Sequence, residues 1–202
     1  FDHCDSIIMG EIDSQPGLDV LLANSGGGFY ILDALTGNIK REWHLGHCQY
    51  VIFGSFLEDM DRPQIIGVTG LGQRFIFNRD LNLMRADFQK ISGEGGATDM
   101  PVNWEGKGVE LLFGARGLYD VFGRLLVPFP EAPPREGDVG IVYNFCGDQR
   151  DEVMFWNAKE AFIYTQKEPF TGHRIYIPKR YPPYNQTIYG GFKSKPNWIK
   201  IK

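Results

Sequence analysis

The sequence has few cysteines, no long hydrophobic run and no block of basic residues, and each shortage excludes a class of protein. Its three cysteines are an odd number at wide spacing, which argues against a small domain held together by disulfides. The best candidate for a membrane-spanning segment, 20–32, is interrupted by Asn24, Ser25 and three glycines. With 21 basic and 25 acidic residues and no polybasic segment, neither nucleic acid nor a membrane is expected as a partner.

Glycine and proline, by contrast, are plentiful. The 202 residues include 25 glycines and 12 prolines, and 43% of the chain is hydrophobic. A chain of this length can bury a substantial core, while so many turn-forming residues make long helices unexpected. The composition therefore predicts a β protein with many turns.

One motif recurs along the chain: an acidic or amide residue followed by a short apolar run. The copies are spaced by 45, 46 and 42 residues and begin at Asp19, Gln64, Glu110 and Glu152. Such regular spacing indicates a repeat protein with a period in the low forties.

Each copy contains the same predicted order of strands. The first strands are expected at 6–12, 50–56, 101–104 and 141–146, and the third strands at 29–32, 74–77, 117–119 and 161–164. Hairpin-like turns follow the third strand in three copies, at 33–37, 78–82 and 120–123, before a fourth strand. Four short antiparallel strands in a repeat of this length are typical of a propeller blade.

We therefore predict an all-β protein, a β-propeller of four blade-like repeats, followed by an extended tail packed on the blades. The repeats are expected at about 1–46, 47–94, 95–135 and 136–177, with the tail at 178–202. We expect the repeats to belong to a seven- or eight-bladed ring, with the remaining blades on a missing segment or on another chain, because a propeller hides the faces of its end blades. The alternative is a small closed ring of four blades.

A His-Cys pair begins each of the first two repeats. His3 and Cys4 precede His47 and Cys48 by 44 residues, and His44 lies nearby. Neutral imidazole and thiolate are good zinc ligands, so these four residues are a candidate metal site. Adjacent residues on a strand point to opposite faces, however, which favours a buried cysteine and a histidine facing the propeller channel instead.

The turns between first and second strands are rich in acidic residues. They resemble calcium-binding loops, in which carboxylate oxygens at alternating positions surround the ion, but none of them has all of the alternating acidic residues. We expect most of them to be solvated turns. Calcium comes before zinc as the expected ion, and no organic cofactor is expected. The chain shows neither a phosphate-binding glycine loop nor a nucleophile-elbow serine.

The sequence resembles the C-terminal part of the β-propeller polysaccharide lyases, which include rhamnogalacturonan lyases, ulvan lyases and rhamnose-glucuronate lyases. Nearly the whole chain takes part in the resemblance. It rests on the segments 3–7, 101–106, 110–112, 117–120, 123–124, 147–156 and 184–187, and on Tyr189.

The resemblance implies cleavage of a uronic-acid-containing polysaccharide by β-elimination, in a secreted or periplasmic protein. That reaction needs a group that neutralises the C5 carboxylate, a base for the C5 proton and an acid near the leaving oxygen. We take His3 as the first candidate for base or carboxylate partner. The other catalytic candidates are His47, Tyr50 and Arg116, and the substrate-binding candidates are Asn103, Trp104 and Tyr119.

Two functions from different classes therefore stay open. One is a lyase acting on an acidic polysaccharide, with part of its active site on other blades. The other is a non-catalytic propeller that serves as a carbohydrate-binding, structural or interaction module.

Overall fold

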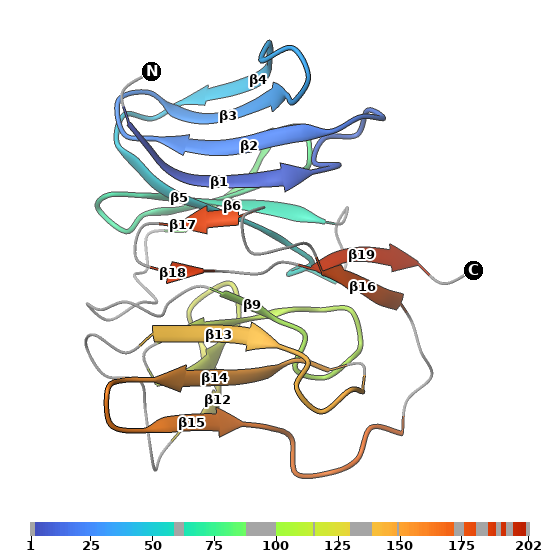
Figure 1. Cartoon of the computed structure of the whole chain (residues 1–202). Helices are drawn as coiled ribbons and strands as arrows, with labels where there is room; N and C mark the ends of the chain where they lie inside the picture. The colour runs from blue at the N-terminus through green and yellow to red at the C-terminus, as the bar shows by residue number, and fades with distance from the viewer. Residues whose placement is uncertain are drawn as a thin grey trace. The chain divides into compact units, whose positions relative to one another are not determined.

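A computed structural model of the chain describes residues 3–58, 63–87, 100–114, 116–129, 139–148 and 150–171, together with the strands beyond residue 175. The described part is built of antiparallel β-strands (Figure 1). It contains no helix of the length and apolar character that a membrane crossing requires. The chain divides into two compact units: unit 1 comprises 1–90 and 183–189, and unit 2 comprises 91–182 and 190–202.

Unit 1 contains two four-stranded sheets whose strands follow one another in chain order. Sheet 1 consists of β1 (Cys4–Gly10), β2 (Asp19–Asn24), β3 (Gly28–Asp33) and β4 (Ile39–His44). Sheet 2 consists of β5 (Cys48–Gly54), β6 (Gln64–Thr69), β7 (Arg74–Phe77) and β8 (Leu83–Asp87). A strand from near the C-terminus, β17 (Gln186–Ile188), pairs with the other edge of β1.

Unit 2 repeats this design. Sheet 3 consists of β9 (Met100–Val102), β10 (Leu111–Gly114), β11 (Gly117–Tyr119) and β12 (Leu125–Pro128). Sheet 4 has three strands within the described residues: β13 (Val139–Tyr143), β14 (Glu152–Trp156) and β15 (Ala161–Tyr164). The remaining strands are β16 (Tyr176–Arg180), which pairs with β19 (Pro196–Lys200), and β18 (Gly191–Phe192).

Each unit has a hydrophobic core between its two sheets. In unit 1 the ring of Phe29 from sheet 1 meets Phe77 from sheet 2 edge-on, with centroids 5.9 Å apart. In unit 2 Phe113 of sheet 3 stacks on Phe155 of sheet 4 at 6.1 Å. Alternation along the strands places these side chains on the facing surfaces, as the period of two requires.

The predicted repeat of four-stranded, blade-like sheets is thus confirmed, but the first strands end earlier than expected. The sequence placed the end of the first strand at residue 12, whereas β1 ends at Gly10. The reason is that the Asp19 side chain accepts hydrogen bonds from the backbone N–H groups of Ile12 and Asp13, at 2.9 and 3.0 Å. These donors are therefore turned away from the strand ladder.

The same side-chain anchor recurs in two further sheets. Gln64 Oε1 accepts from the backbone of Phe56 and Leu57, and Glu152 Oε2 accepts from Phe145 and Cys146. The acidic or amide residue before the apolar run therefore closes the loop between the first and second strands in these three sheets. All three anchoring side chains are fully buried.

In sheet 3 the position equivalent to Asp19 lies one residue later than the sequence motif indicates. Asp19 pairs with the turn residue Asp33, whereas in sheet 3 Leu112 pairs with Tyr119, which immediately precedes the turn residue Asp120. Leu111, and not Glu110, is thus the structural equivalent of Asp19. A shift of one residue exchanges the two faces of a strand, so the correction decides which side chains of sheet 3 meet sheet 4.

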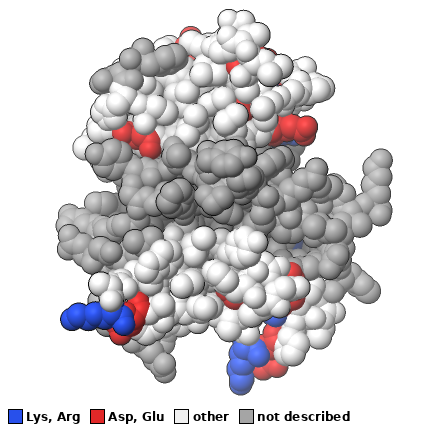
Figure 2. Space-filling view, in the orientation of Figure 1, with Lys and Arg blue, Asp and Glu red and all other residues white. Residues whose placement is uncertain are grey.

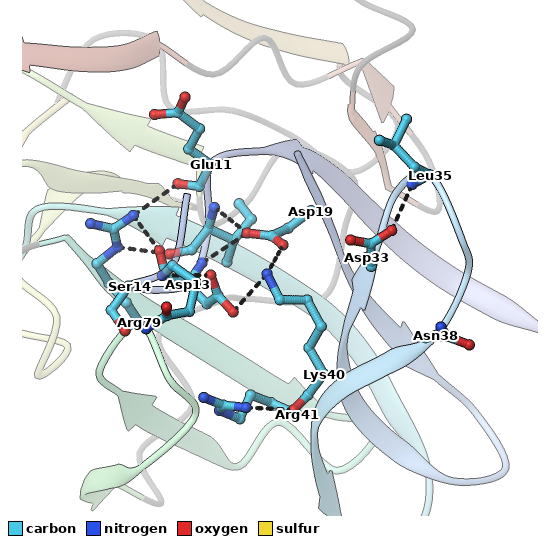
Figure 3. Close-up of polar contacts among 12 residues, drawn as sticks. Glu11, Asp13, Ser14, Asp19, Asp33, Leu35, Asn38, Lys40, Arg41 and Arg79 are labelled. Atoms are coloured by element: carbon cyan, nitrogen blue, oxygen red, sulfur yellow. Dashed lines mark hydrogen bonds and ion pairs between the residues drawn. The ribbon is translucent and has the colours of Figure 1, made fainter. Parts of the chain in front are cut away.

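Polar contacts tie the first loop of sheet 1 to sheet 2 (Figure 3). Arg79 donates from Nε to the backbone oxygen of Ile12 at 2.8 Å and also reaches the backbone oxygens of Glu11 and Asp13. Beside it, Lys40 Nζ contacts the carboxylates of Asp13 at 2.9 Å and Asp19 at 2.7 Å. The two carboxylates are therefore held within sheet 1, by Lys40 of β4, whereas the backbone oxygens of the loop join it to Arg79 of sheet 2.

The C-terminal tail was expected to be extended and packed on the blades. Its strand β17 does pair with β1, through Ser6 and Ile188, Ile7 and Thr187, and Ile8 and Gln186. The residues at 181–185, 189–190 and 193–195 lie outside the described residues, as do parts of the resemblance motif at 184–189.

Candidate functional site

The candidate site lies at one end of sheet 1, where four strands begin or end in one row. The row runs from Cys4 through Asn24 and Gly28 to His44, each paired with the next. His3 precedes this row, and His47 precedes β5 of sheet 2. We call the cluster of His3, Asp5, Ser25, His44 and His47 the histidine edge.

The His3 ring is held through both of its nitrogens. Nε2 lies 3.0 Å from Asp5 Oδ1, and Nδ1 shares a hydrogen bond of 3.0 Å with the hydroxyl of Ser25. The backbone oxygen of His3 also accepts a hydrogen bond from the backbone N–H of Ser25 at 3.1 Å. The β2–β3 turn thus fixes the ring, although 63% of its side chain is exposed.

His47 approaches the same carboxylate from sheet 2. Its Nε2 lies 3.5 Å from Asp5 Oδ2, and its side chain is 56% exposed. The other side of the ring rests on Gly70, where an added Cβ would be 2.9 Å from Nδ1. Asp5, which is 1% exposed, therefore links two exposed imidazoles from neighbouring sheets.

His44 extends the cluster along the end of sheet 1. Its ring packs edge-on against Tyr30, with centroids 6.0 Å apart, and its Nε2 lies 3.5 Å from Glu42. Burial, followed by the nearby carboxylate of Glu42, raises the pKa of the Tyr30 phenol. Tyr30 therefore stays a neutral hydroxyl at physiological pH, beneath an exposed imidazole.

The two cysteines of the predicted metal set make other contacts. Cys48 is fully buried in the unit 1 core, and burial raises the pKa of its thiol to about 12. The Cys4 thiol donates to the backbone oxygen of Ser6 at 3.3 Å. A thiol inside an apolar core does not fit a zinc ligand, because binding requires the thiolate. Across the described ranges, no group of three or more His, Cys, Asp or Glu side chains is placed to hold a metal ion.

The remaining candidates are divided between the units. Tyr50 is half-buried in β5 of unit 1, while Arg116 is exposed in the β10–β11 turn of unit 2. Asn103 and Tyr119 are 0% and 6% exposed. Trp104 packs on the unit 2 core, and its backbone oxygen accepts from Gln166 at 2.9 Å.

The predicted substrate-binding residue Asn103 makes backbone hydrogen bonds within unit 2. The backbone N–H of Asn103 donates to Asp151 Oδ2 at 2.9 Å, and its backbone oxygen accepts from the Asp151 N–H. This reciprocal pair joins the loops of sheets 3 and 4. Arg150, expected to form a structural ion pair, contacts Asp148, donates to the Glu168 backbone and lies over the Phe170 ring.

Asp5 and Ser25 were not predicted as site residues, although the spacing of His3 and Asp5 could have indicated Asp5. Residues two apart on a strand point to the same face, so a histidine at 3 and a carboxylate at 5 share a face. The His47 contact could not have been found in this way, because it depends on how sheet 2 packs beside sheet 1.

The fold class follows from the repeated anchors and turns: the chain is an all-β protein of the β-propeller type, with four blade-like repeats. No protein-family model matches the sequence, and no curated protein matches it. Among solved structures, the crystal structure of the V. cholerae biofilm matrix protein Bap1 is similar, at 16% sequence identity and a TM-score of 0.45. The match covers 77% of this chain but 29% of the Bap1 chain.

Proposed function

We propose that this chain is a non-catalytic, carbohydrate-binding propeller module, and that its histidine edge binds an acidic polysaccharide. The observation that carries the proposal is that Asp5 holds the exposed rings of His3 and His47 side by side. Imidazoles present both a ring face and polar ring nitrogens. Such a surface suits a sugar chain that carries carboxylates.

The same geometry argues against β-elimination at His3. A base must have a ring nitrogen available to take the C5 proton of the uronate. Both nitrogens of His3 are already engaged, one with Asp5 and one with Ser25. Catalysis by His3 would require one of these contacts to break first, whereas packing of a sugar on the exposed face of the His3 ring requires neither to change.

Binding and cleavage can be measured on the same samples. Calorimetry with polygalacturonate and with alginate should show binding to at least one of the two, and neutral dextran should show none. The double variant His3→Ala/His47→Ala should bind at least about tenfold more weakly, because a hydrogen bond to a charged group contributes about 1.5–3 kcal/mol and each 1.4 kcal/mol is a factor of ten. Lys107→Ala is the matched control, since this lysine is 73% exposed and lies in unit 2.

Two results would contradict the proposal. One is the absence of binding to either polyuronate, or binding that the double variant leaves unchanged. The other is the appearance of an unsaturated product, followed by its ultraviolet absorbance, that is lost in His3→Ala. That second result would favour the lyase in place of the binding module.

A further inference from the structure

Sheet 4 differs from the other three sheets in one row of side chains. In every sheet the residue two positions before the end of the first strand begins a row of three cross-strand neighbours. The rows are Ile8, Leu21 and Ile31 in sheet 1; Ile52, Ile66 and Ile76 in sheet 2; Met100, Phe113 and Leu118 in sheet 3; and Ile141, Met154 and Ile163 in sheet 4. We call these the forward rows.

The forward rows of sheets 1 and 3 face the next sheet along the chain. The row of sheet 1 belongs to the core that sheet 1 shares with sheet 2, and the row of sheet 3 to the core shared with sheet 4. Every member of the forward rows of sheets 1, 2 and 3 is at most 3% exposed. In sheet 4, Ile163 is 54% exposed, and Ile141 and Met154 are half-buried.

A second position shows the same contrast. The residue four positions after the start of each row follows the first strand and is Ile12, Phe56, Trp104 or Phe145. Ile12 and Trp104 pack in the cores of their units, and Ile12 and Phe56 are 1% and 5% exposed. Phe145 is 42% exposed, although its backbone N–H is anchored by Glu152 in the same manner.

The other face of sheet 4 is already occupied. Val153 and Phe155 alternate with Met154 along β14, are fully buried and belong to the core shared with sheet 3. Both faces of the sheet are thus apolar, which is typical of a sheet covered on both sides. Figure 2 shows mainly uncharged surface over β13–β15, with charged side chains at its margins.

Sheet 1 carries the complementary face. In sheet 2, the face that meets sheet 1 includes Val51, Phe53, Ile65 and Phe77, and none of them is more than 6% exposed. The equivalent residues of sheet 1 are Ile7, Met9, Val20 and Leu32, and all four are half-buried. This one chain therefore contains both halves of an interface between sheets, at its first and at its last sheet.

We propose that the forward row of sheet 4 packs against sheet 1 of a second copy of this chain. The packing continues the one seen between sheets 1 and 2 and between sheets 3 and 4. It covers Ile163 and Phe145 in one copy and Val20 and Leu32 in the other. An interface between two different faces is heterologous, so it gives a closed ring if the rotation closes and an open chain of copies if it does not.

The experiment measures the mass of the full chain by analytical ultracentrifugation across a range of concentrations. The wild type should assemble into dimers or larger species. Ile163→Lys should be monomeric, and so should Leu32→Glu, because each places a charge in one half of the interface. Leu35→Lys is the matched control, since Leu35 is 88% exposed and lies in a turn outside both faces. Circular dichroism checks that each variant is folded.

Mixing the two variants tests the pairing of faces directly. In an equimolar mixture, the altered sheet 4 of one variant meets the altered sheet 1 of the other as a lysine–glutamate pair. The remaining interface between them is wild type on both sides. The mixture should therefore assemble while each variant alone does not.

Three outcomes would overturn the proposal. The first is a wild type that stays monomeric at every concentration, which would mean that the faces are covered in another way. The second is an assembly that survives Ile163→Lys. The third is an assembly that Ile163→Lys abolishes but Leu32→Glu leaves intact, which would indicate that sheet 4 pairs with sheet 4.

Discussion

Replacing Lys40 with methionine should destabilise unit 1 strongly. Its ammonium lies between the carboxylates of Asp13 and Asp19, at 2.9 and 2.7 Å, and both carboxylates are fully buried (Figure 3). Removing one partner of a buried ion pair costs about 3–5 kcal/mol, because the other charge stays buried without compensation. Lys40 is 20% exposed, and Asp19 keeps two backbone donors, so we expect a loss of about 2–3 kcal/mol.

Urea unfolding, followed by tryptophan fluorescence and circular dichroism, measures this loss. The hydrogen bonds from Lys40 to Asp13 and then Asp19 raise the pKa of the lysine. A raised pKa in the folded state means that the stabilisation is complete below the ordinary lysine pKa of about 10.4 and is lost as pH rises through the folded value. The difference between wild type and Lys40→Met should therefore be constant from neutral pH to about pH 10 and narrow above it.

Lys159→Met is the matched control, because Lys159 is exposed in the β14–β15 turn. It should change the free energy of unfolding by less than about 0.5 kcal/mol. The reasoning would be refuted if Lys40→Met were as mild as this control, since two buried carboxylates that lose the cation they share should destabilise unit 1 by more than that.

Three further predictions concern packing, the loop anchors and the thiols. Gly67→Ala should lower the stability of unit 1 by about 1–3 kcal/mol in urea unfolding, because its Cβ would lie 2.5 Å from the Phe29 ring; an unchanged midpoint would contradict the packing. Glu152→Gln should unfold close to the wild type, since Gln64 closes the equivalent loop with an amide oxygen, whereas Glu152→Ala should lose about 2–3 kcal/mol from two buried donors. Equal losses in both variants would show that the charge, and not the acceptor, matters. N-ethylmaleimide at pH 8 should modify exposed Cys146 first and exposed Cys4 more slowly, because burial raises the pKa of the Cys4 thiol. Cys48 should stay unmodified in the native protein, because burial raises its pKa to about 12; mass spectrometry of the peptides shows which thiols react.

The sequence was sufficient to predict the repeat, because three of the four sheets carry a buried acidic or amide anchor at the same place and every sheet carries an apolar run beside it. It misplaced the ends of the first strands because Ile12 and Phe145 have the apolar character of strand residues. What ends the strands is the bonding of their backbone N–H groups to Asp19 and Glu152. That bonding depends on the fold and leaves no periodicity of its own in the segment that it ends.

The candidate site was predictable only where it depends on a single strand. The repeated histidines drew attention to the end of the sheets where His3 and His47 share the Asp5 carboxylate, and the alternation rule anticipated that histidine and cysteine of one pair differ in their surroundings. The spacing of the His-Cys pairs, however, made histidine and cysteine equally good candidates for the site. It could not show that Cys48 lies inside the core while His47 contacts Asp5 of another sheet. The substrate-binding candidates Asn103 and Tyr119 likewise carry polar groups that suit a sugar, and the sequence could not show that both are buried in unit 2.

The forward row of sheet 4 shows how comparison between repeats gives meaning to an exposed side chain. An exposed isoleucine on a surface is ordinary and needs no explanation. Ile163 has three structural equivalents in the same chain, Ile31, Ile76 and Leu118, and each of them is fully buried. The repeat therefore supplies its own reference state: in sheets 1 and 3 the same position, strand and register are covered by the next sheet. Measured against that reference, the exposure of Ile163 and Phe145 marks the position of a missing neighbour, and the half-buried face of sheet 1 has the composition that such a neighbour requires.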